Sequence, residues 1–155
     1  MKINIIVAMA DNRAIGFHNQ LLYHIPEDMK RFKGLTIGHT VVMGRRTYAS
    51  LPNGALPHRR NIVLSRTTKS IEGCDVYTSL EEALQSCTES EEVFIIGGES
   101  VYRQAIPMAH RIYLTLVEKT PEQADAFFPN LCMTQWNETT KEKRDGFSFI
   151  QYDRK

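Results

Sequence analysis

Short apolar runs alternate with helix-forming segments along this chain. The clearest runs cover residues 3–9, 40–44, 60–65, 93–96 and 111–117. Runs rich in Ile, Val and Leu at this length are typical of strands that are buried on both faces of a parallel sheet. Because parallel strands need crossover connections, the alternation with helical segments favours an α/β fold.

The remaining elements are shorter. We expect strands at residues 75–77 and 148–152 as well. Helices are expected at residues 28–35, 45–50, 79–84 and 100–105, the third opened by Ser79 with Glu82 three positions later. The glycine-containing segment 11–19 is expected to be a polar loop.

Composition limits the function classes. The 155 residues fit one domain, 1–155, with 42% hydrophobic residues and a net charge of +1, so no overall field attracts nucleic acid or a membrane. No apolar stretch approaches the roughly 20 residues of a membrane span, and the first run reads as a strand rather than a signal peptide. Cys74, Cys87 and Cys132 are expected to be reduced thiols, with Cys87 packed on a helix, and the five histidines show no metal-ligand spacing.

One acid is predicted to point inward. At about 100° per residue, Asp28 and Phe32 project within roughly 40° of each other beside Met29, whereas Glu27 and Arg31 share the other face. A buried carboxylate costs free energy unless it is paired or protonated, so this position indicates a ligand that hydrogen-bonds Asp28. Alternatively, Asp28 only stabilises the first helical turn after Pro26, and the sequence leaves both interpretations open.

Three strand ends suit phosphate. Gly44-Arg45-Arg46-Thr47 combines a strand end, a helix start and two guanidinium groups. Leu64-Ser65-Arg66 adds a hydroxyl and a third arginine, and paired Gly97-Gly98 lets a ligand approach the backbone closely. Because ligands of open α/β sheets bind beyond the carboxyl ends of strands, the three clusters together predict a nucleotide site. No G-x-G-x-x-G motif follows the first strand, so a fold other than the Rossmann domain is expected to supply it.

These residues, in this order, resemble the dihydrofolate reductase family. The matching fragments, from Ile5 to Pro129, are Ala14-Ile15-Gly16 with Asn19, Pro26 with Asp28, Phe32-Lys33 with Thr36, Val42-Met43-Gly44-Arg45 with Thr47, Leu56-Pro57 with Arg59, Asn61 to Arg66, Ile96-Gly97-Gly98 with Tyr102, Tyr113-Leu114-Thr115, and Asp125 with Phe128-Pro129. The resemblance implies a mostly parallel mixed sheet of about eight strands, an antiparallel C-terminal strand and about four flanking helices.

The resemblance also implies the substrate site. Asp28 would accept hydrogen bonds from the pterin ring and from Thr115, and Arg59 would bind the α-carboxylate of the glutamate tail, leaving Arg60 facing solvent. The other residues implied to bind substrate are Ile6, Ala8, Met29, Phe32, Leu56, Ile96 and Tyr102, most of them expected to be buried.

NADPH is the implied cofactor. Its phosphates would meet the three strand-end clusters, and the Gly97-Gly98 peptide bond would be cis. The residues implied to bind NADPH are Ala8, Ile15, Gly16, Asn19, Leu21, Gly44, Arg45, Arg46, Thr47, Leu64, Ser65, Arg66, Ile96, Gly97, Gly98, Glu99, Ser100, Val101 and Tyr102. The segment from Gly16 to Leu22 would cover the nicotinamide and exclude water.

The implied reaction is hydride transfer from NADPH to C6 of 7,8-dihydrofolate with protonation of N5 from water, which supplies one-carbon and thymidylate metabolism. The chain departs from the family where Leu22-Tyr23 replaces the usual Pro-Trp, so Tyr23 is a candidate to take the place of that Trp near Asp28. The resemblance further implies a cytoplasmic monomer, without metal, that binds diaminopyrimidine antifolates.

Two alternatives remain open at this point. A related reductase of a pyrimidine in riboflavin synthesis shares the fold and NADPH, although Asp28, Phe32 and Arg59 favour a folate. A non-catalytic module that binds nucleotides or RNA through Arg45, Arg46, Arg59, Arg60 and Arg66 is less consistent with the balanced charge.

Overall fold

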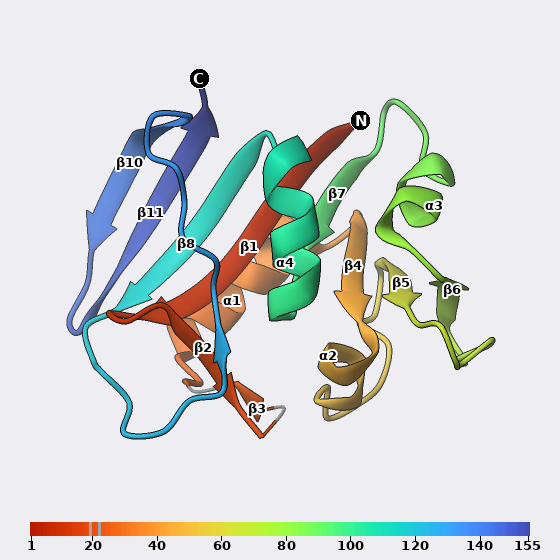
Figure 1. The fold of residues 1–155 in the computed structure, drawn as a ribbon, viewed down its shortest axis with the longest axis horizontal. Coiled ribbons are helices and arrows are strands. Elements are labelled where there is room, and N and C mark those ends of the chain that lie inside the picture. Colours follow the sequence, from red (N-terminus) through yellow and green to blue (C-terminus); the bar gives the residue numbers. More distant parts are fainter. Residues whose placement is uncertain (19, 22) are drawn as a thin grey trace.

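The computed structural model describes residues 1–18, 20–21 and 23–155. Within these residues the chain is built on one large sheet, with helices on both of its faces (Figure 1). The strands of this sheet, in chain order, are β1 (Lys2–Ala10), β4 (Thr40–Gly44), β5 (Arg60–Leu64), β6 (Cys74–Tyr77), β7 (Glu92–Ile95), β8 (Arg111–Val117), β10 (Trp136–Lys143) and β11 (Phe147–Arg154). The helices are α1 (Pro26–Thr36), α2 (Arg45–Ala49), α3 (Leu80–Gln85), α4 (Glu99–Ala105) and the 3-10 turn η1 (Ile106–Met108).

The strand order is β10-β11-β8-β1-β7-β4-β5-β6, counted over the described residues. Neighbouring strands from β8 to β6 run parallel, and β11 and β10 add two antiparallel pairings at the other edge. This is the predicted mixed sheet with an antiparallel C-terminal strand. β1 leads through α1 to β4, and β7 leads through α4 to β8; these two helices lie on opposite faces of the sheet (Figure 1).

Alternate residues of the central strands fill two separate cores. On β7, Val93 and Ile95 pack into one hydrophobic cluster and Phe94 into the other, and all three are at most 1% exposed. On β4, Val42 joins the first cluster and Val41 the second. Both faces of these strands are therefore apolar, because helices or loops cover each face, and this explains why their sequences read as continuous apolar runs.

Strand β10 of the large sheet was not predicted. β10 carries Trp136 as its only buried residue, and the seven residues that follow are exposed. An edge strand with charged, exposed side chains resists pairing with other chains, but it shows no hydrophobic alternation that the sequence could reveal. Its register with β11 is broken between Glu138 and Thr140.

The segment 11–19 is also more regular than expected. Ala14–Phe17 forms strand β2, which pairs with β3 (Gln20–Leu21) and with β9 (Ala126–Phe127) in a small second sheet. Residues 14–16 are buried there, because the partner strand β9 comes from a distant part of the chain. The prediction of a polar loop was therefore wrong for these residues.

No described helix is long and apolar enough to cross a membrane.

Candidate active site

Asp28 lies in the first turn of α1 and faces β8. The N-cap of this helix is Ile25, which makes no side-chain capping bond, and Pro26 occupies the first helical position. The Asp28 carboxylate does not cap the helix; its Oδ1 accepts a 2.5 Å hydrogen bond from the Thr115 hydroxyl. The predicted hydrogen bond between these two residues is therefore present, and no described residue donates to Oδ2.

Burial perturbs this carboxyl group. Asp28 is half-buried, and removal from water raises its pKa above the ordinary aspartate value. The hydrogen bond from Thr115 and the positive charge of Arg31 act in the opposite direction and lower its pKa. A half-buried acid with a perturbed pKa and a free oxygen is a typical feature of a binding or catalytic site.

The residues expected to surround the pterin are mostly partly buried. Ile6, Ala8, Phe32, Leu56 and Ile96 are of intermediate exposure. Tyr102 is 4% exposed, and its hydroxyl donates a 2.8 Å hydrogen bond to the carbonyl oxygen of Ile6. Burial, followed by the charge of Asp28, raises the pKa of Tyr102, so this phenol is neutral beside the carboxylate.

Met29 differs from the expectation. Its side chain is 56% exposed, whereas a residue adjoining Asp28 was expected to be buried. Thr36 is the one fully buried residue of α1, so the helix contacts the sheet through a narrow stripe. Met29 lies about 100° around the helix from Asp28, outside that stripe.

Arg59 lies beside the carboxyl-terminal end of α1. Its Nη1 donates to Thr36 Oγ1 at 3.1 Å and its Nε donates to the Pro57 carbonyl at 2.9 Å. Among the described residues it forms no ion pair, and partial burial lowers its pKa without removing its charge. A fixed guanidinium without an acidic partner can bind a carboxylate of a ligand.

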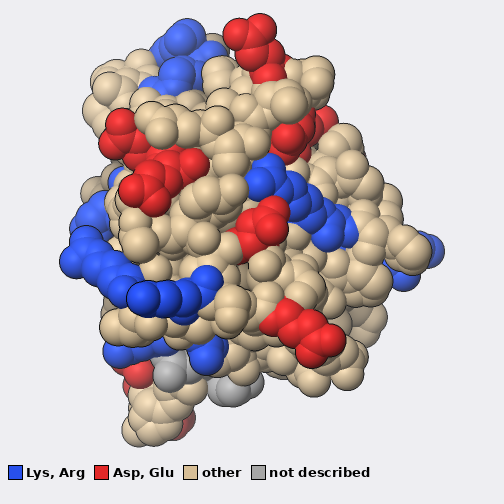
Figure 2. Space-filling view, turned by 90° about the vertical axis from the view of Figure 1, so that its right-hand side faces the viewer, with Lys and Arg blue, Asp and Glu red and all other residues tan. Residues whose placement is uncertain are grey.

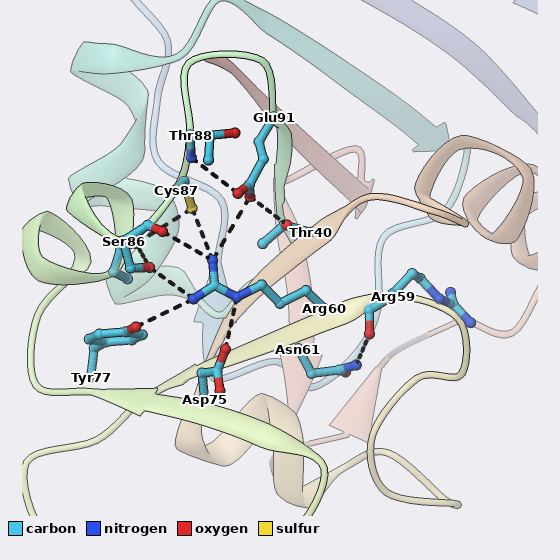
Figure 3. A network of polar contacts seen from close by, with 11 residues as sticks. Thr40, Arg59, Arg60, Asn61, Asp75, Tyr77, Ser86, Cys87, Thr88 and Glu91 are labelled. Atoms are coloured by element: carbon cyan, nitrogen blue, oxygen red, sulfur yellow. Dashed lines mark hydrogen bonds and ion pairs between the residues drawn. The ribbon is translucent and has the colours of Figure 1, made fainter.

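Arg60, the next residue, was expected to face solvent, and this was wrong. Figure 3 shows its guanidinium enclosed by side chains from β6, from the end of α3 at Ser86 and from the loop before β7, with Arg59 pointing away. Arg60 Nε lies 2.8 Å from Asp75 Oδ2, and its Nη2 donates to Ser86 Oγ at 3.0 Å and to Tyr77 Oη at 3.3 Å. These partners are distant in sequence, which is why the sequence gave no sign of them. Cys87 packs nearby. It was expected to lie on a helix, but α3 ends at Gln85, two residues before it.

A cavity of about 1030 Å³ opens at the carboxyl ends of β1, β4, β5, β6 and β7. Of the residues predicted to bind NADPH, those that line it are Ala8, Ile15, Gly16, Gly44, Arg45, Arg46, Thr47, Leu64, Ser65, Arg66, Ile96, Gly97, Gly98, Glu99, Ser100, Val101 and Tyr102. Asn19 lies outside the described residues, and the Leu21 side chain is likewise not described. The strand ends therefore converge on one site, as their motifs predicted.

Sequence reasoning missed part of this wall. The additional lining residues are Val7, Ser50, Thr78, Ser79, Leu80, Arg103, Gln104, Asp125 and Ala126. Thr78 and Ser79 follow β6, so their position at a strand end was a usable signal. Ser79 also caps α3, where its hydroxyl accepts the Glu82 amide at 3.1 Å as predicted. Asp125 and Ala126 reach the cavity only through the pairing of β9 with β2.

The donor set of this cavity fits a phosphorylated dinucleotide. Arg45, Arg46 and Arg66 line it, and none of the three forms an ion pair with a described residue. By contrast, Arg103 is paired with Glu99 at 2.9 Å. Three uncompensated guanidinium groups match the charge of a pyrophosphate and a further phosphate.

Glycines also shape the backbone of the cavity wall. The Gly97-Gly98 peptide bond is cis, as the resemblance implied, and Gly97 has a φ of 127°. The Gly97 carbonyl accepts the Gly44 amide at 2.8 Å, and a Cβ on Gly44 would lie 3.4 Å from Val101 Cγ2. Glycine at these positions keeps β4 and α4 close together at the cavity wall.

Tyr23 and Asp28 are not joined by a hydrogen bond in the structure. Tyr23 is of intermediate exposure and precedes α1. The large cavity is not lined by five of the residues expected at the substrate site: Asp28, Phe32, Leu56, Arg59 and Thr115. Ala8, Ile96 and Tyr102, which are expected to contact both substrate and cofactor, do line it. No group of three or more potential metal ligands occurs among the described residues.

The geometry defines an α/β enzyme with a nucleotide cavity at the strand ends and a half-buried acid beside it. Figure 2 looks onto the β6 side of the molecule, and on this face it shows acidic side chains close to the basic ones. This arrangement gives no support to an RNA-binding surface there.

Comparison with known proteins identifies the family. A family model described as dihydrofolate reductase matches residues 2–154. Dihydrofolate reductase of Neisseria gonorrhoeae is 42% identical over 159 residues, covering 98% of each chain, and that of Bacillus subtilis is 37% identical, covering 99% of this chain and 95% of the relative. Dihydrofolate reductase HdrB of Haloferax volcanii is 39% identical over 97% of this chain. The chain belongs to the dihydrofolate reductase family. It is an NADPH-dependent oxidoreductase that reduces dihydrofolate to tetrahydrofolate, the first of the possibilities raised by the sequence.

Proposed function

We propose that Asp28 binds the pterin ring of dihydrofolate during this reduction. The observation that carries the proposal is a half-buried carboxylate whose Oδ1 is fixed by Thr115 while no described residue donates to Oδ2. A carboxylate with one oxygen held in place can accept a pair of parallel N–H donors, as an amino group and an adjacent ring N–H provide.

The charge of Asp28 also favours the reaction. A negative charge beside the pterin stabilises the positive charge that develops when N5 takes a proton from water. Hydride then reaches C6 from NADPH, which supplies both electrons. Asp28 thus orients the substrate and stabilises its protonated form, without itself having to deliver the proton.

The strand-end arginines hold the cofactor in this proposal. Arg45, Arg46 and Thr47 bind the pyrophosphate and the 2′-phosphate, and Ser65 with Arg66 binds the 2′-phosphate. The backbone from Gly97 to Tyr102 lines the same cavity and would contact the pyrophosphate and nicotinamide. Ala8, Ile15 and Gly16, which line the same cavity, exclude water from the hydride path.

Arg59 binds the α-carboxylate of the glutamate tail, supported by its fixed position on Thr36 and Pro57 and by the lack of an ion pair with any described residue. For Tyr23 we propose a hydroxyl that binds a water near Asp28. Replacement of Tyr23 by Phe is then expected to lower kcat by less than about tenfold with little change in NADPH affinity.

Asp28→Asn tests the central proposal. We expect hydride transfer to fall by orders of magnitude at neutral pH while NADPH affinity stays nearly unchanged, measured by single-turnover fluorescence and by cofactor titration. Glu27→Gln is the matched control, because Glu27 is exposed and pairs with Arg144 at 2.8 Å. Full turnover by Asp28→Asn, or equal loss of cofactor binding, would contradict the proposal.

Further properties follow from the same site. Diaminopyrimidine antifolates carry an amidine-like edge and are proposed to bind Asp28 in the same way. We also propose that the protein acts as a cytoplasmic monomer; the three cysteines are free in the structure, which suits a reducing compartment.

A further inference from the structure

Arg31 occupies an unexpected position on α1. The sequence placed it with Glu27 on the face opposite Asp28, but its guanidinium is half-buried against the sheet. The guanidinium carbon lies 4.4 Å from the ring centroid of Phe149 and 5.7 Å from that of Tyr113. Stacking on these rings fixes the cation, since aromatic faces attract a guanidinium and cover its planar surface.

The sheet places this cation beside Asp28. Phe149 on β11 is the register partner of Thr115 on β8, so their side chains lie next to each other on one face of the sheet. Asp28 binds Thr115, and Arg31, three residues later on the same helix, stacks on Phe149. The two charged side chains therefore lie over neighbouring residues of the same sheet face, although no salt bridge joins them.

The other charges near Arg31 belong to the β10 and β11 hairpin. Arg144 is the second cation over Phe149, at 5.5 Å, but it pairs with Glu27 at 2.8 Å and with Glu142 at 3.1 Å. Glu142 also attracts Arg31. The net charge of the Arg144, Glu27 and Glu142 group is negative, so it does not supply a positive field to Asp28.

The remaining elements around Asp28 add no free charge. On β8, Tyr113 accepts a hydrogen bond from Arg111, which is paired with Asp153 at 2.6 Å. On α4, the buried Tyr102 phenol is neutral. Among the residues that the structure describes, Arg31 forms no salt bridge and is the cation whose charge acts on Asp28.

We propose that Arg31 is a positioning residue for catalysis: its guanidinium, held on Phe149 and Tyr113, keeps the neighbouring Asp28 ionised in a partly desolvated site. Arginine suits this role because it keeps its charge when buried. The inference rests on the proposed role of Asp28 and extends it, since burial alone favours the neutral acid that could not stabilise a protonated pterin.

The test is a direct titration of the Asp28 carboxyl group in the full chain without ligands. The 13C signal of the carboxyl carbon is assigned by its loss in Asp28→Asn and is followed against pH. In Arg31→Gln we expect the pKa of Asp28 to rise by about 1 unit, because a charge at this separation in a partly wet site contributes an interaction of that order. Arg31→Lys retains the charge and is expected to stay within about 0.3 units of the parent protein.

Arg144→Gln is the matched control, because it removes a cation over the same ring whose charge is already neutralised by two acids. It is expected to move the Asp28 titration less than Arg31→Gln does. If Arg31→Gln does not fold, Glu142→Gln replaces it. Glu142 has a 61% exposed side chain, and the loss of its negative charge is expected to lower the pKa of Asp28 by a few tenths of a unit.

The outcomes separate the two proposals. An unchanged titration in Arg31→Gln, an equal rise in Arg31→Lys, or a rise in Glu142→Gln overturns the role of Arg31. If in that case Asp28→Asn still abolishes hydride transfer, the role of Asp28 stands. Full activity of Asp28→Asn instead removes the basis of both. A rise confined to Arg31→Gln, with rescue by Arg31→Lys, supports the inference, because a purely structural role would not follow the charge.

Discussion

The hydroxyl of Thr115 on β8 donates a 2.5 Å hydrogen bond to Oδ1 of Asp28 on α1, joining residues 87 positions apart. Thr115 is 2% exposed and pairs in register with Ala8, which lines the large cavity. This contact therefore connects the acid on the helix with the strand beside the cavity, and it fixes one oxygen of the carboxylate.

Loss of this contact is expected to weaken substrate binding. In Thr115→Val the pKa of Asp28 rises further, because the hydrogen bond from Thr115 lowers it. As the pH falls, the carboxylate then becomes protonated at a higher pH than in the parent protein. KM for dihydrofolate is therefore expected to increase by about fivefold near neutral pH and by more in acid. Steady-state kinetics across pH measures this effect. Thr115→Ser, which retains the hydroxyl, is expected to behave like the parent protein; an equal loss in both variants would point to packing instead.

The same acid is expected to lower the stability of the fold at neutral pH. Because burial raises the pKa of Asp28, the folded state binds a proton that the unfolded chain releases between the ordinary and the raised pKa. Its contribution to stability therefore decreases as pH rises through the folded-state pKa. Asp28→Asn is expected to melt at a higher temperature than the parent protein near pH 8, and the difference should shrink toward about pH 4. Thermal denaturation at both pH values measures it, and a variant that is destabilised equally at both would disagree.

Arg66 and Arg103 both line the cavity but are expected to differ in function. Arg66 forms no ion pair with a described residue, whereas Arg103 is paired with Glu99. Arg66→Ala is expected to weaken NADPH binding by about 10- to 100-fold, the value of a charge-assisted hydrogen bond, while leaving NADH binding unchanged. Arg103→Ala should change either affinity by less than about threefold. Calorimetric titration with both nucleotides measures this, and an equal loss for NADPH and NADH in Arg66→Ala would exclude a contact with the 2′-phosphate.

The neighbouring residues Arg59 and Arg60 are expected to differ in role: Arg59 contributes to substrate binding and Arg60 to the stability of the fold. Arg60 is enclosed by Asp75, Tyr77 and Ser86, as Figure 3 shows, so Arg60→Met should cost about 2 kcal/mol of unfolding free energy without changing kcat/KM. Arg59→Met should raise KM for dihydrofolate more than about tenfold and leave turnover of dihydropteroate, which lacks the glutamate tail, unchanged. Urea denaturation and kinetics with both substrates distinguish the pair, and the reverse pattern would contradict the assignment.

Much of the fold could be predicted because the strands of a parallel sheet are continuous apolar runs in the sequence. The ranges 40–44 and 111–117 agree with β4 and β8 to the residue. Their side chains are buried on both faces of the sheet, so local hydrophobicity alone marks them. β10 could not be found in this way, since an exposed edge strand has no apolar periodicity.

The site was predicted in part for a similar reason. Glycine and arginine at strand ends are local signals, and the topology brings the ends of parallel strands to one edge. Arg31 and Arg60 carried no such signal. Their partners, Phe149 and Asp75, come from other strands, and only the folded chain shows that both guanidinium groups are held in place.

The sequence by itself determined the central parallel strands and the helices, which side of α1 carries the acid, and which strand ends can bind phosphate, because these properties depend on residues close together in the chain. The tertiary structure decided which distant groups meet: Thr115 with Asp28, Arg31 with Phe149, and β9 with β2. The physical reason is that strand pairing and helix docking set the distances between charges, and those distances decide whether a buried carboxylate is stabilised.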